Sequence, residues 1–189
     1  FNVIENGAPR WEPIPTQTVF EGGSASTELT GYLSDFDENG DPVPPSEISL
    51  SLVSNSNEGL IQVSLDGQTV SASTVDQDSH GVAEVVIMAD DGSKTSQTSL
   101  VFYVINVNDA PEIDVSILDG IALKSGEIAS IGILPLISDI DDPDDEIWVD
   151  VDTSIPGAAQ FDYVTGVLDM QWNQPGTHTV KMTLIDSHG

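Results

Sequence analysis

The side chains in this sequence that could do chemistry are mainly carboxylates gathered in short clusters. A hard cation such as Ca²⁺ takes about six to eight oxygen ligands, so a site for it needs several short acidic loops brought together. Two acids separated by one residue suit this chemistry, because alternate side chains of a loop can be aimed at one ion. Each cluster alone is equally compatible with a solvated turn, so the argument rests on the set. In the first half of the chain the clusters are Glu21, Asp35 with Asp37, Asp76 with Asp78, and Asp90 with Asp91.

The overall charge bounds the choice of partners. The chain has 32 Asp and Glu residues against 4 Lys and Arg residues, a formal net charge of -28. Nucleic acid and anionic membrane surfaces are disfavoured, because binding them needs clustered basic residues. So acidic a chain repels itself unless salt screens the charge or bound cations cancel it. Because the acids are clustered rather than spread along strand faces, bound cations are favoured over a halophilic surface.

Other chemistry has weaker support. The chain has no cysteine, which excludes disulfides and thiolate sites. His178 is expected on the apolar face of a strand, and His80 and His188 in Asp-Ser-His-Gly turns, so all three are interpreted as structural. Residues 35–46 imitate an EF-hand loop but lack flanking helices and the final acid, and a metal held by that loop alone stays an alternative. No ordered nucleophile, base and oxyanion set is visible, so we predict that the chain is not an enzyme.

The elements that must position the acids are predicted to be β-strands. Apolar and polar residues alternate in 177–185, which is the period of a half-buried strand, and no capped window of helical period appears. Turn residues such as Asp66-Gly67 separate the alternating segments. The same alternation predicts strands at Glu47–Val53, Gln68–Ser73, Val82–Ala89, Ser99–Ile105 and Glu146–Asp152.

An internal repeat sets the domain organisation. Asn6-Gly7-Ala8-Pro9 recurs as Asn108-Asp109-Ala110-Pro111, and Leu33-Ser34-Asp35-Phe36-Asp37 recurs as Ile137-Ser138-Asp139-Ile140-Asp141. We therefore expect an all-β chain of two tandem Greek-key β-sandwich domains, at 8–109 and 110–189. The second domain is expected to lack its last strand, because nothing in it matches Ser99–Ile105.

Residues 1–7 are interpreted as the end of a preceding repeat. Phe1 to Asn6 has the pattern of a strand tail, and two explanations fit it together with the missing strand. The favoured one is that the sequence is cut from a continuous array. The alternative is that Phe1 to Asn6 is a donor strand that inserts into the second domain of a neighbouring subunit.

The acidic clusters, in this order and at these intervals, resemble cadherin repeats and the looser prokaryotic cadherin-like repeats. Glu21 matches the Glu near the first strand, and Asp76-Gln77-Asp78 is similar to the family's Asp-Arg-Glu loop. Ala89-Asp90-Asp91-Gly92 is similar to the Ala-x-Asp segment, and Asn106-Val107-Asn108-Asp109-Ala110-Pro111 to the linker between repeats. The linker departs from the family pattern by opening with Asn and lacking a second Asn, so weaker calcium binding than in the animal proteins is expected.

The resemblance implies where calcium would be held. At the junction of the repeats it implies the ligands Glu21, Asp76, Asp78, Asn106, Asn108, Asp109, Asp139, Asp141 and Asp186. A second, upper site is implied by Asp35, Asp37 and Asp90, facing a preceding repeat. The second domain lacks a lower set of ligands, and residues 161–176 look more like an Ig-like repeat.

The expected function is that of a calcium-rigidified structural or adhesion module in an extracellular, multi-repeat prokaryotic cell-surface or filament protein. Expected partners are neighbouring repeats or subunits of the same protein, and cell-surface proteins or glycans. No segment approaches the roughly 20 apolar residues that span a bilayer, so membrane insertion is not expected. The alternative is a carbohydrate-binding accessory module of a secreted enzyme, in which Trp11, Trp148 and Trp172 would supply a stacking platform.

Overall fold

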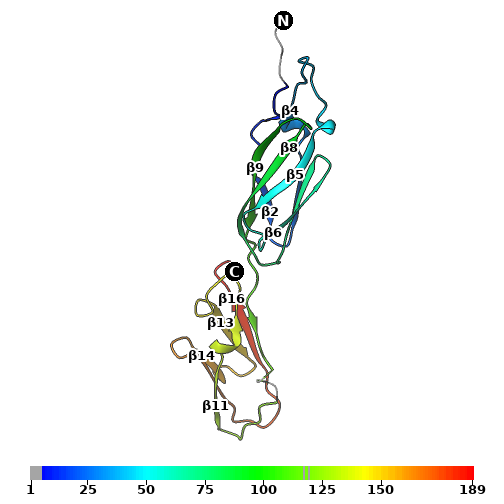
Figure 1. Ribbon diagram of the computed structural model, residues 1–189. Coiled ribbons are helices and arrows are strands. Elements are labelled where there is room, and N and C mark those ends of the chain that lie inside the picture. The colour runs from blue at the N-terminus through cyan, green and yellow to red at the C-terminus, as the bar shows by residue number, and fades with distance from the viewer. Residues whose placement is uncertain (1–5, 117, 119) are drawn as a thin grey trace. The chain divides into compact units, whose positions relative to one another are not determined.

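The computed structural model describes residues 6–116, 118 and 120–189 of the chain. Within these residues the regular structure consists of β-strands and three short 3₁₀ turns, which confirms the expected all-β class (Figure 1). Two compact units are present, Phe1–Val107 and Asn108–Gly189, here called unit 1 and unit 2. Their boundary falls close to the junction expected from the repeat. In the described ranges, no helix is long and apolar enough to cross a membrane.

Unit 1 is a sandwich of two facing sheets. In the larger sheet the strand order is β2-β9-β8-β5, with β2 parallel to β9 and the other neighbours antiparallel. These strands are β2 (Gln17–Phe20), β5 (Ser49–Asn55), β8 (Gly81–Asp90) and β9 (Thr95–Ile105). The smaller sheet has the order β3-β7-β6, from β3 (Ser24–Glu28), β6 (Ile61–Asp66) and β7 (Thr69–Thr74). At one end β1 (Arg10–Trp11) pairs with β4 (Leu33–Ser34).

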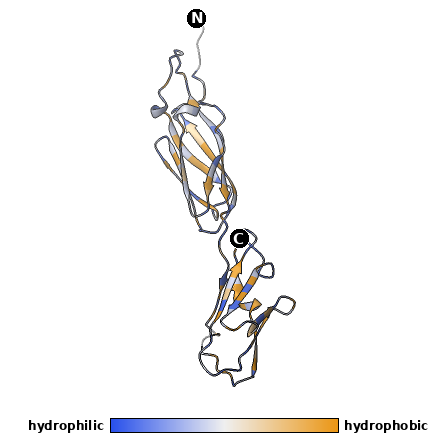
Figure 2. Cartoon of the chain, turned by 180° about the vertical axis from the view of Figure 1, so that it is seen from behind, coloured by the Kyte–Doolittle hydropathy of each residue, from blue (hydrophilic) through white to orange (hydrophobic). Residues whose placement is uncertain are grey.

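The core of unit 1 follows from strand alternation, because successive side chains of a strand point to opposite faces. In β8 the inward residues Ala83, Val85 and Ile87 are 0% exposed. Leu100 and Phe102 of β9 are equally buried beside them. Burying a side chain of this size stabilises the fold by about 1.5–3 kcal/mol. Figure 2 shows the resulting bands of hydrophobic and hydrophilic residues along the strands.

Unit 2 has the same plan with fewer strands. One sheet has the order β11-β15-β14, from β11 (Ile128–Gly132), β14 (Ala159–Asp162) and β15 (Val167–Gln171). Facing it, β13 (Trp148–Thr153) pairs with β16 (Val180–Ile185), and β10 (Glu112–Ile113) pairs with β12 (Ile137–Ser138). The core is centred on Ile133, Ile137, Val149 and Leu168. The described part of unit 2 contains no strand in the position of β9.

The sequence repeat corresponds to repeated local structure. In unit 1 the ladder pairs Arg10 with Ser34, and in unit 2 it pairs Glu112 with Ser138. Each ladder is preceded by a 3₁₀ turn, Thr30–Tyr32 in unit 1 and Leu134–Leu136 in unit 2. In each unit the first recurring motif lies directly before the first strand of this ladder, and the second motif contains the other strand and the start of the loop that follows it.

Two expectations about strands need comment. The alternating segment at 177–185 forms a strand only from Val180, because a strand needs a neighbour and residues 177–179 have none within the described chain. In unit 1 the matching residues of β8 pair with β9 alone. The expected strand tail at Phe1 to Asn6 lies, except for Asn6, outside the described residues.

Candidate metal centres at the strand ends

Glu21 places a nearly buried carboxylate at the end of unit 1 where β9 finishes. It directly follows β2, which lies beside β9, and its side chain is only 4% exposed. One oxygen, Oε1, accepts a hydrogen bond from the Val107 amide at 2.7 Å. The other, Oε2, is buried without a hydrogen-bond donor, and His80 Nδ1 lies 3.8 Å from it. A buried carboxylate oxygen without a protein partner is costly, so this atom is suited to bind a cation.

The loop containing Asp76 and Asp78 lies beside Glu21. A Cβ added to Gly22 would lie 3.8 Å from the carbonyl oxygen of Gln77, so the loop passes within van der Waals distance of the residue after Glu21. Asp76 and Asp78 are exposed, and Oδ1 of Asp76 accepts the Asp78 amide at 3.2 Å. The structure thus brings together at one end of unit 1 four residues expected as ligands, Glu21, Asp76, Asp78 and the exposed Asn106 that precedes Val107.

At the end of unit 1 that holds the β1–β4 ladder, Asp35 is the most buried acid. It is 4% exposed, and its Oδ1 accepts the Phe36 amide, while Oδ2 is buried without a hydrogen-bond donor in the described chain. Burial raises the pKa of Asp35 above its usual value of 3.8, and the adjacent Asp91 carboxylate raises it further, against the lowering effect of the Phe36 amide. Two carboxyl groups that face each other in this way repel as anions, so the arrangement favours a proton or a cation between them.

Asp91, which the sequence-based set did not include, replaces Asp90 as the central partner at this end. Its Oδ2 accepts the Asn6 side-chain amide at 3.2 Å, and its Oδ1 accepts the amides of Ser93 and Lys94. These amides lower the pKa of Asp91. Asp90 instead accepts the Gly92 amide within its own turn. The internal repeat of the sequence could have identified Asp91, because the Asn6–Asp91 contact recurs in unit 2 as a contact between Asn108 and Asp186.

Asp37 is engaged mainly within its own loop. Its Oδ1 accepts the amides of Asn39 and Asp41 at 2.8 and 2.9 Å, and these hydrogen bonds, led by that of Asp41, lower its pKa. Phe36 forms an isolated β-bridge with Pro42, so the segment is a tight hairpin-like turn. An EF-hand reading of residues 35–46 finds no support, since no helix flanks the turn in the described chain.

Unit 2 gathers its acids at the end where its chain begins. The Asn108 side-chain amide donates to Asp186 Oδ2 at 2.8 Å, and the Asp109 amide donates to Asp141 Oδ2 at 2.7 Å. Asp139 accepts the Asp141 amide through Oδ1, while its Oδ2 is buried without a hydrogen-bond partner. The structure thus joins the expected linker ligands to those of the second domain by hydrogen bonds, in the pairs Asn108–Asp186, Asp109–Asp141 and Asp141–Asp139.

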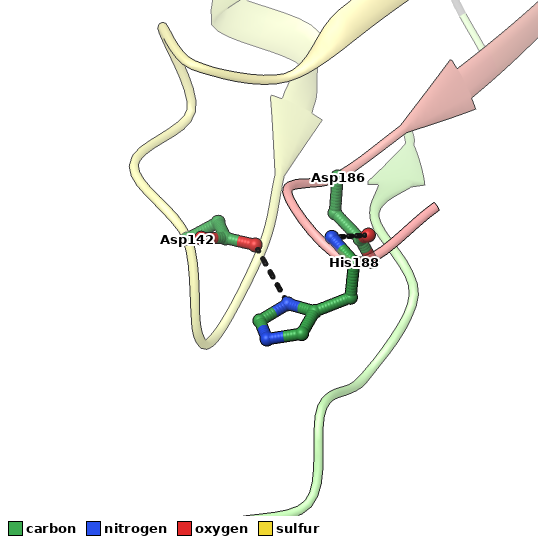
Figure 3. A group of neighbouring side chains, drawn as sticks. All are labelled: Asp142, Asp186 and His188. Carbon is green, nitrogen blue, oxygen red and sulfur yellow. Dashed lines mark hydrogen bonds and ion pairs between the residues drawn. The ribbon is translucent and has the colours of Figure 1, made fainter.

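Asp142 and His188 extend this set and were not expected in it. His188 Nδ1 lies 3.8 Å from Asp142 Oδ2, and the His188 amide donates to Asp186 Oδ1 at 2.7 Å. One potential ligand atom from each of Asp142, Asp186 and His188 lies within 4.8 Å of the others. Figure 3 shows the imidazole directed at Asp142, from the segment that follows β16. A turn histidine gave no sequence signal for this position, because the contact joins residues far apart in the chain.

Many of the buried atoms without a hydrogen-bond partner are oxygens of the acidic sets. Among the described residues, nine buried side-chain atoms lack a hydrogen-bond partner, and five of them are oxygens in the sets described above. Amide and carboxylate oxygens are the ligands that Ca²⁺ prefers, so these residues fit that ion. The five oxygens belong to Asn6, Glu21, Asp35, Asn108 and Asp139.

No family model matches the chain, and no curated protein matches its sequence significantly. Solved structures do match its fold. The first two domains of human protocadherin-24 align with 96% of this chain and 88% of their own length, with a TM-score of 0.52 and 14% identity. The ectodomain of human desmocollin-1 aligns with 100% of this chain, at 17% identity and a TM-score of 0.46. An endo-fucoidan hydrolase of glycoside hydrolase family 107 aligns with 95% of the chain at a TM-score of 0.39.

The comparison with protocadherin-24 shows the fold. This chain consists of cadherin-like β-sandwiches, as the resemblance of its acidic motifs implied. It spans 35% of the desmocollin-1 ectodomain, about a third of that protein's length. At such low sequence identity the comparison supports the fold alone, so the function has to be argued from the residues of this chain.

Proposed function

We propose that this chain is a calcium-rigidified structural or adhesion module of an extracellular, multi-repeat protein of a prokaryotic cell surface or filament, and that it has no catalytic role. The observation that carries the proposal is a group of buried oxygens without partners, four of which belong to residues expected as calcium ligands: Glu21, Asp35, Asn108 and Asp139. Neighbouring repeats or subunits of the same protein are its proposed partners.

The proposed mechanism is electrostatic. Without calcium, the carboxylates at each end of a sandwich repel one another, as Asp35 and Asp91 do. With calcium, a shared positive ion reverses that repulsion and holds the loops together. At the formal net charge of -28, each bound ion also relieves repulsion over the whole chain.

We propose that calcium orders the linker segment Val107 to Asp109. Val107 is fixed to unit 1 through Glu21, and Asn108 and Asp109 are fixed to unit 2 through Asp186 and Asp141. Each of these anchoring acids is a proposed ligand. An ion bound to the acid would therefore hold the backbone that the acid already contacts.

Thermal unfolding with and without calcium tests this function. Extracellular calcium modules bind with dissociation constants of about 10⁻⁴ to 10⁻³ M. Ligand at about 100 times its dissociation constant stabilises the native state by about 2.7 kcal/mol. The melting temperature should therefore rise clearly in millimolar calcium chloride and much less in sodium chloride of equal ionic strength. Equal effects of the two salts would show that the acids form only a halophilic surface.

A second candidate function, binding of neutral carbohydrate, is favoured by one exposed aromatic pair in unit 2. Trp148 is 57% exposed and Tyr163 is 48% exposed, and their rings stack with centroids 4.7 Å apart and an interplanar angle of 29°. The Tyr163 hydroxyl donates to the Val149 carbonyl, which fixes its ring. Trp11 and Trp172 are not part of this pair, since each packs against a core.

Affinity electrophoresis in gels containing hydroxyethylcellulose or galactomannan tests the second candidate. Retardation of the chain that is abolished by Trp148→Ala would support it, because sugar rings stack on exposed aromatic faces. Tyr103→Ala is the matched control, since Tyr103 is 49% exposed on unit 1 and belongs to no aromatic pair found in the described residues. Absence of retardation, or equal loss in both variants, would reject carbohydrate binding at this pair.

A further inference from the structure

A groove runs along unit 2 beside β16. It has a volume of about 470 Å³, and its walls come from β15, from β16 and from the residues that precede β11. Nine of its thirteen lining residues have apolar side chains, and the others are one glycine, two threonines and one histidine. The main apolar residues that line it are Leu123, Leu168, Met170, Trp172, Val180 and Met182.

The groove lies where unit 1 places β9. β16 pairs with β13 over Val180–Ile185 in the same way as β8 pairs with β5 over its last six residues, from Val85 to Asp90. The glycines that precede these segments, Gly81 and Gly176, share a φ of +142°. These features establish β16 as the counterpart of the second half of β8.

The inward face of β16 is less covered than that of β8. Val85 and Ile87 of β8 are 0% exposed, because Leu100 and Phe102 of β9 pack beside them. Their counterparts Val180, Met182 and the neighbouring Leu184 are only partly buried. Apolar surface that one sandwich buries is thus left open to the groove in the other.

Two segments of unit 2 that have strand counterparts in unit 1 are not strands. Residues 176–179 match the first part of β8, which pairs with β9 only. Residues 121–124 match β2, whose only ladder is also with β9. The second match follows from the order of the segments along the chain. In unit 1, β2 is followed by Gly22 and then by β3; in unit 2, residues 121–124 are followed by Gly126 and then by β11. The two glycines have similar φ angles of +66° and +77°.

One strand would account for all of these differences. We propose that the groove of unit 2 binds a further polypeptide strand in the place of β9, antiparallel to residues 176–185 and parallel to residues 121–124. The strand is extended and carries an apolar residue at every second position, as Leu100, Phe102 and Val104 do in β9. Strand addition to an open edge supplies main-chain hydrogen bonds, and the groove supplies pockets for the alternate side chains.

The register of the β8–β9 ladder in unit 1 predicts which residue of unit 2 each residue of the bound strand would face. In unit 1, Val85 faces Leu100 and Ala83 faces Phe102 across the β8–β9 ladder. In unit 2 the counterpart of Val85 is Val180, and the counterpart of Ala83 is His178, which stacks on Trp172 at 5.2 Å. The bound strand should therefore place an aliphatic residue opposite Val180 and a smaller residue than Phe opposite the bulkier His178.

Amide hydrogen exchange of the full chain tests the proposal. The probe is a synthetic peptide of residues 95–109 of this sequence with Phe102→Val, which contains β9 with polar ends and places a smaller residue opposite His178. On binding, it should slow exchange by about tenfold or more at residues 121–124 and 176–179, because new ladders would protect amides that belong to no strand in the described chain. A peptide with Leu100→Ser, Phe102→Ser and Val104→Ser is the control and should protect neither segment.

Paired variants of β16 separate the groove from the rest of the strand. Met182→Lys places a charge in the groove and should abolish the protection, whereas Thr183→Lys, on the exposed face of the same strand, should preserve it. Leu123→Asp should also abolish protection, and it lies outside any strand, so it keeps the test valid if Met182→Lys fails to fold.

Three results would overturn the proposal. The first is unchanged exchange at 121–124 and 176–179 with the peptide in excess. The second is equal protection by the serine-substituted peptide. The third is a dimer of the chain alone, seen by analytical ultracentrifugation, with protection confined to Val180–Ile185, which would assign the edge of β16 to a second copy.

Discussion

A carboxylate that is buried with one oxygen unpartnered is stable only when a proton or a cation satisfies it. Asp35 is in this state, at 4% exposure and beside the Asp91 carboxyl group. The native state holds the proton of Asp35 more tightly than the unfolded chain does. The contribution of Asp35 to the free energy of unfolding is therefore fully present at low pH. That contribution is lost as the pH rises through its raised native pKa.

Substitution of Asp35→Asn should therefore have opposite effects with and without calcium. In metal-free buffer at pH 7, the variant should raise the free energy of unfolding by about 1 kcal/mol, because it removes a buried charge that repels Asp91. In millimolar calcium, the variant should gain less stability than the parent chain, because a ligand is missing. Urea denaturation in both buffers measures the effect, with exposed Glu84→Gln as the control. A loss of stability in both buffers would contradict the assignment.

The candidate sites could be predicted only in part from the sequence. Glu21 and Asp139 follow strand ends and match family motifs, so they were found, and each has a buried oxygen without a partner. Asp91 and Asp142 were missed because each stands beside another acid. The choice between neighbouring acids depends on the strand's final alternation and on the loop it enters, which sequence spacing alone does not fix.

At the scale of elements, the turn between β14 and β15 shows how tightly one connection is specified. Gly166 has a φ of +67°, and its carbonyl accepts the amides of Ile133 and Leu134. A Cβ at this position would lie 2.7 Å from the Cβ of Leu134. The turn therefore needs glycine for its backbone angle and for its close contact with the 3₁₀ turn before β12.

Two glycine substitutions separate these requirements. Gly166→Ala should destabilise unit 2 by about 3 kcal/mol, from the sum of the backbone cost and the clash. Gly157→Ala should cost only about 1 kcal/mol, because Gly157 has a similar φ of +78° but nothing within 4 Å of an added Cβ. Urea denaturation measures both. Equal costs would mean that Leu134 moves aside freely.

The strands were predictable where alternation and a partner strand coincide. Val82–Ala89 and Ser99–Ile105 were expected and lie inside β8 and β9. The extent of β16 was not predictable, since alternation continues into 177–179 while pairing does not. The short ladders of β1 with β4 and β10 with β12 contain two residues per strand, too few for a period to be recognised.

At the scale of the whole molecule, the proposed function makes the link between the units depend on calcium. The double substitution Asp139→Ala with Asp141→Ala should leave both units folded, because these loops lie outside the cores. In millimolar calcium, small-angle scattering should then report a broader distribution of lengths than for the parent chain. Asp150→Ala with Asp152→Ala removes two exposed acids from β13 and serves as the charge-matched control. An unchanged distribution would remove those two residues from the proposed site.

The parallel pairing of β2 with β9 has a mechanical consequence. These two strands lie near the start and the end of unit 1, and they run side by side over Gln17–Phe20. Tension applied through the two ends of the unit would slide the strands along each other, so all hydrogen bonds of the ladder would resist the load at once. An antiparallel pair pulled from its open end would instead break one bond at a time. Unit 2 has no ladder of this kind in its described residues, so under load it should extend before unit 1 does.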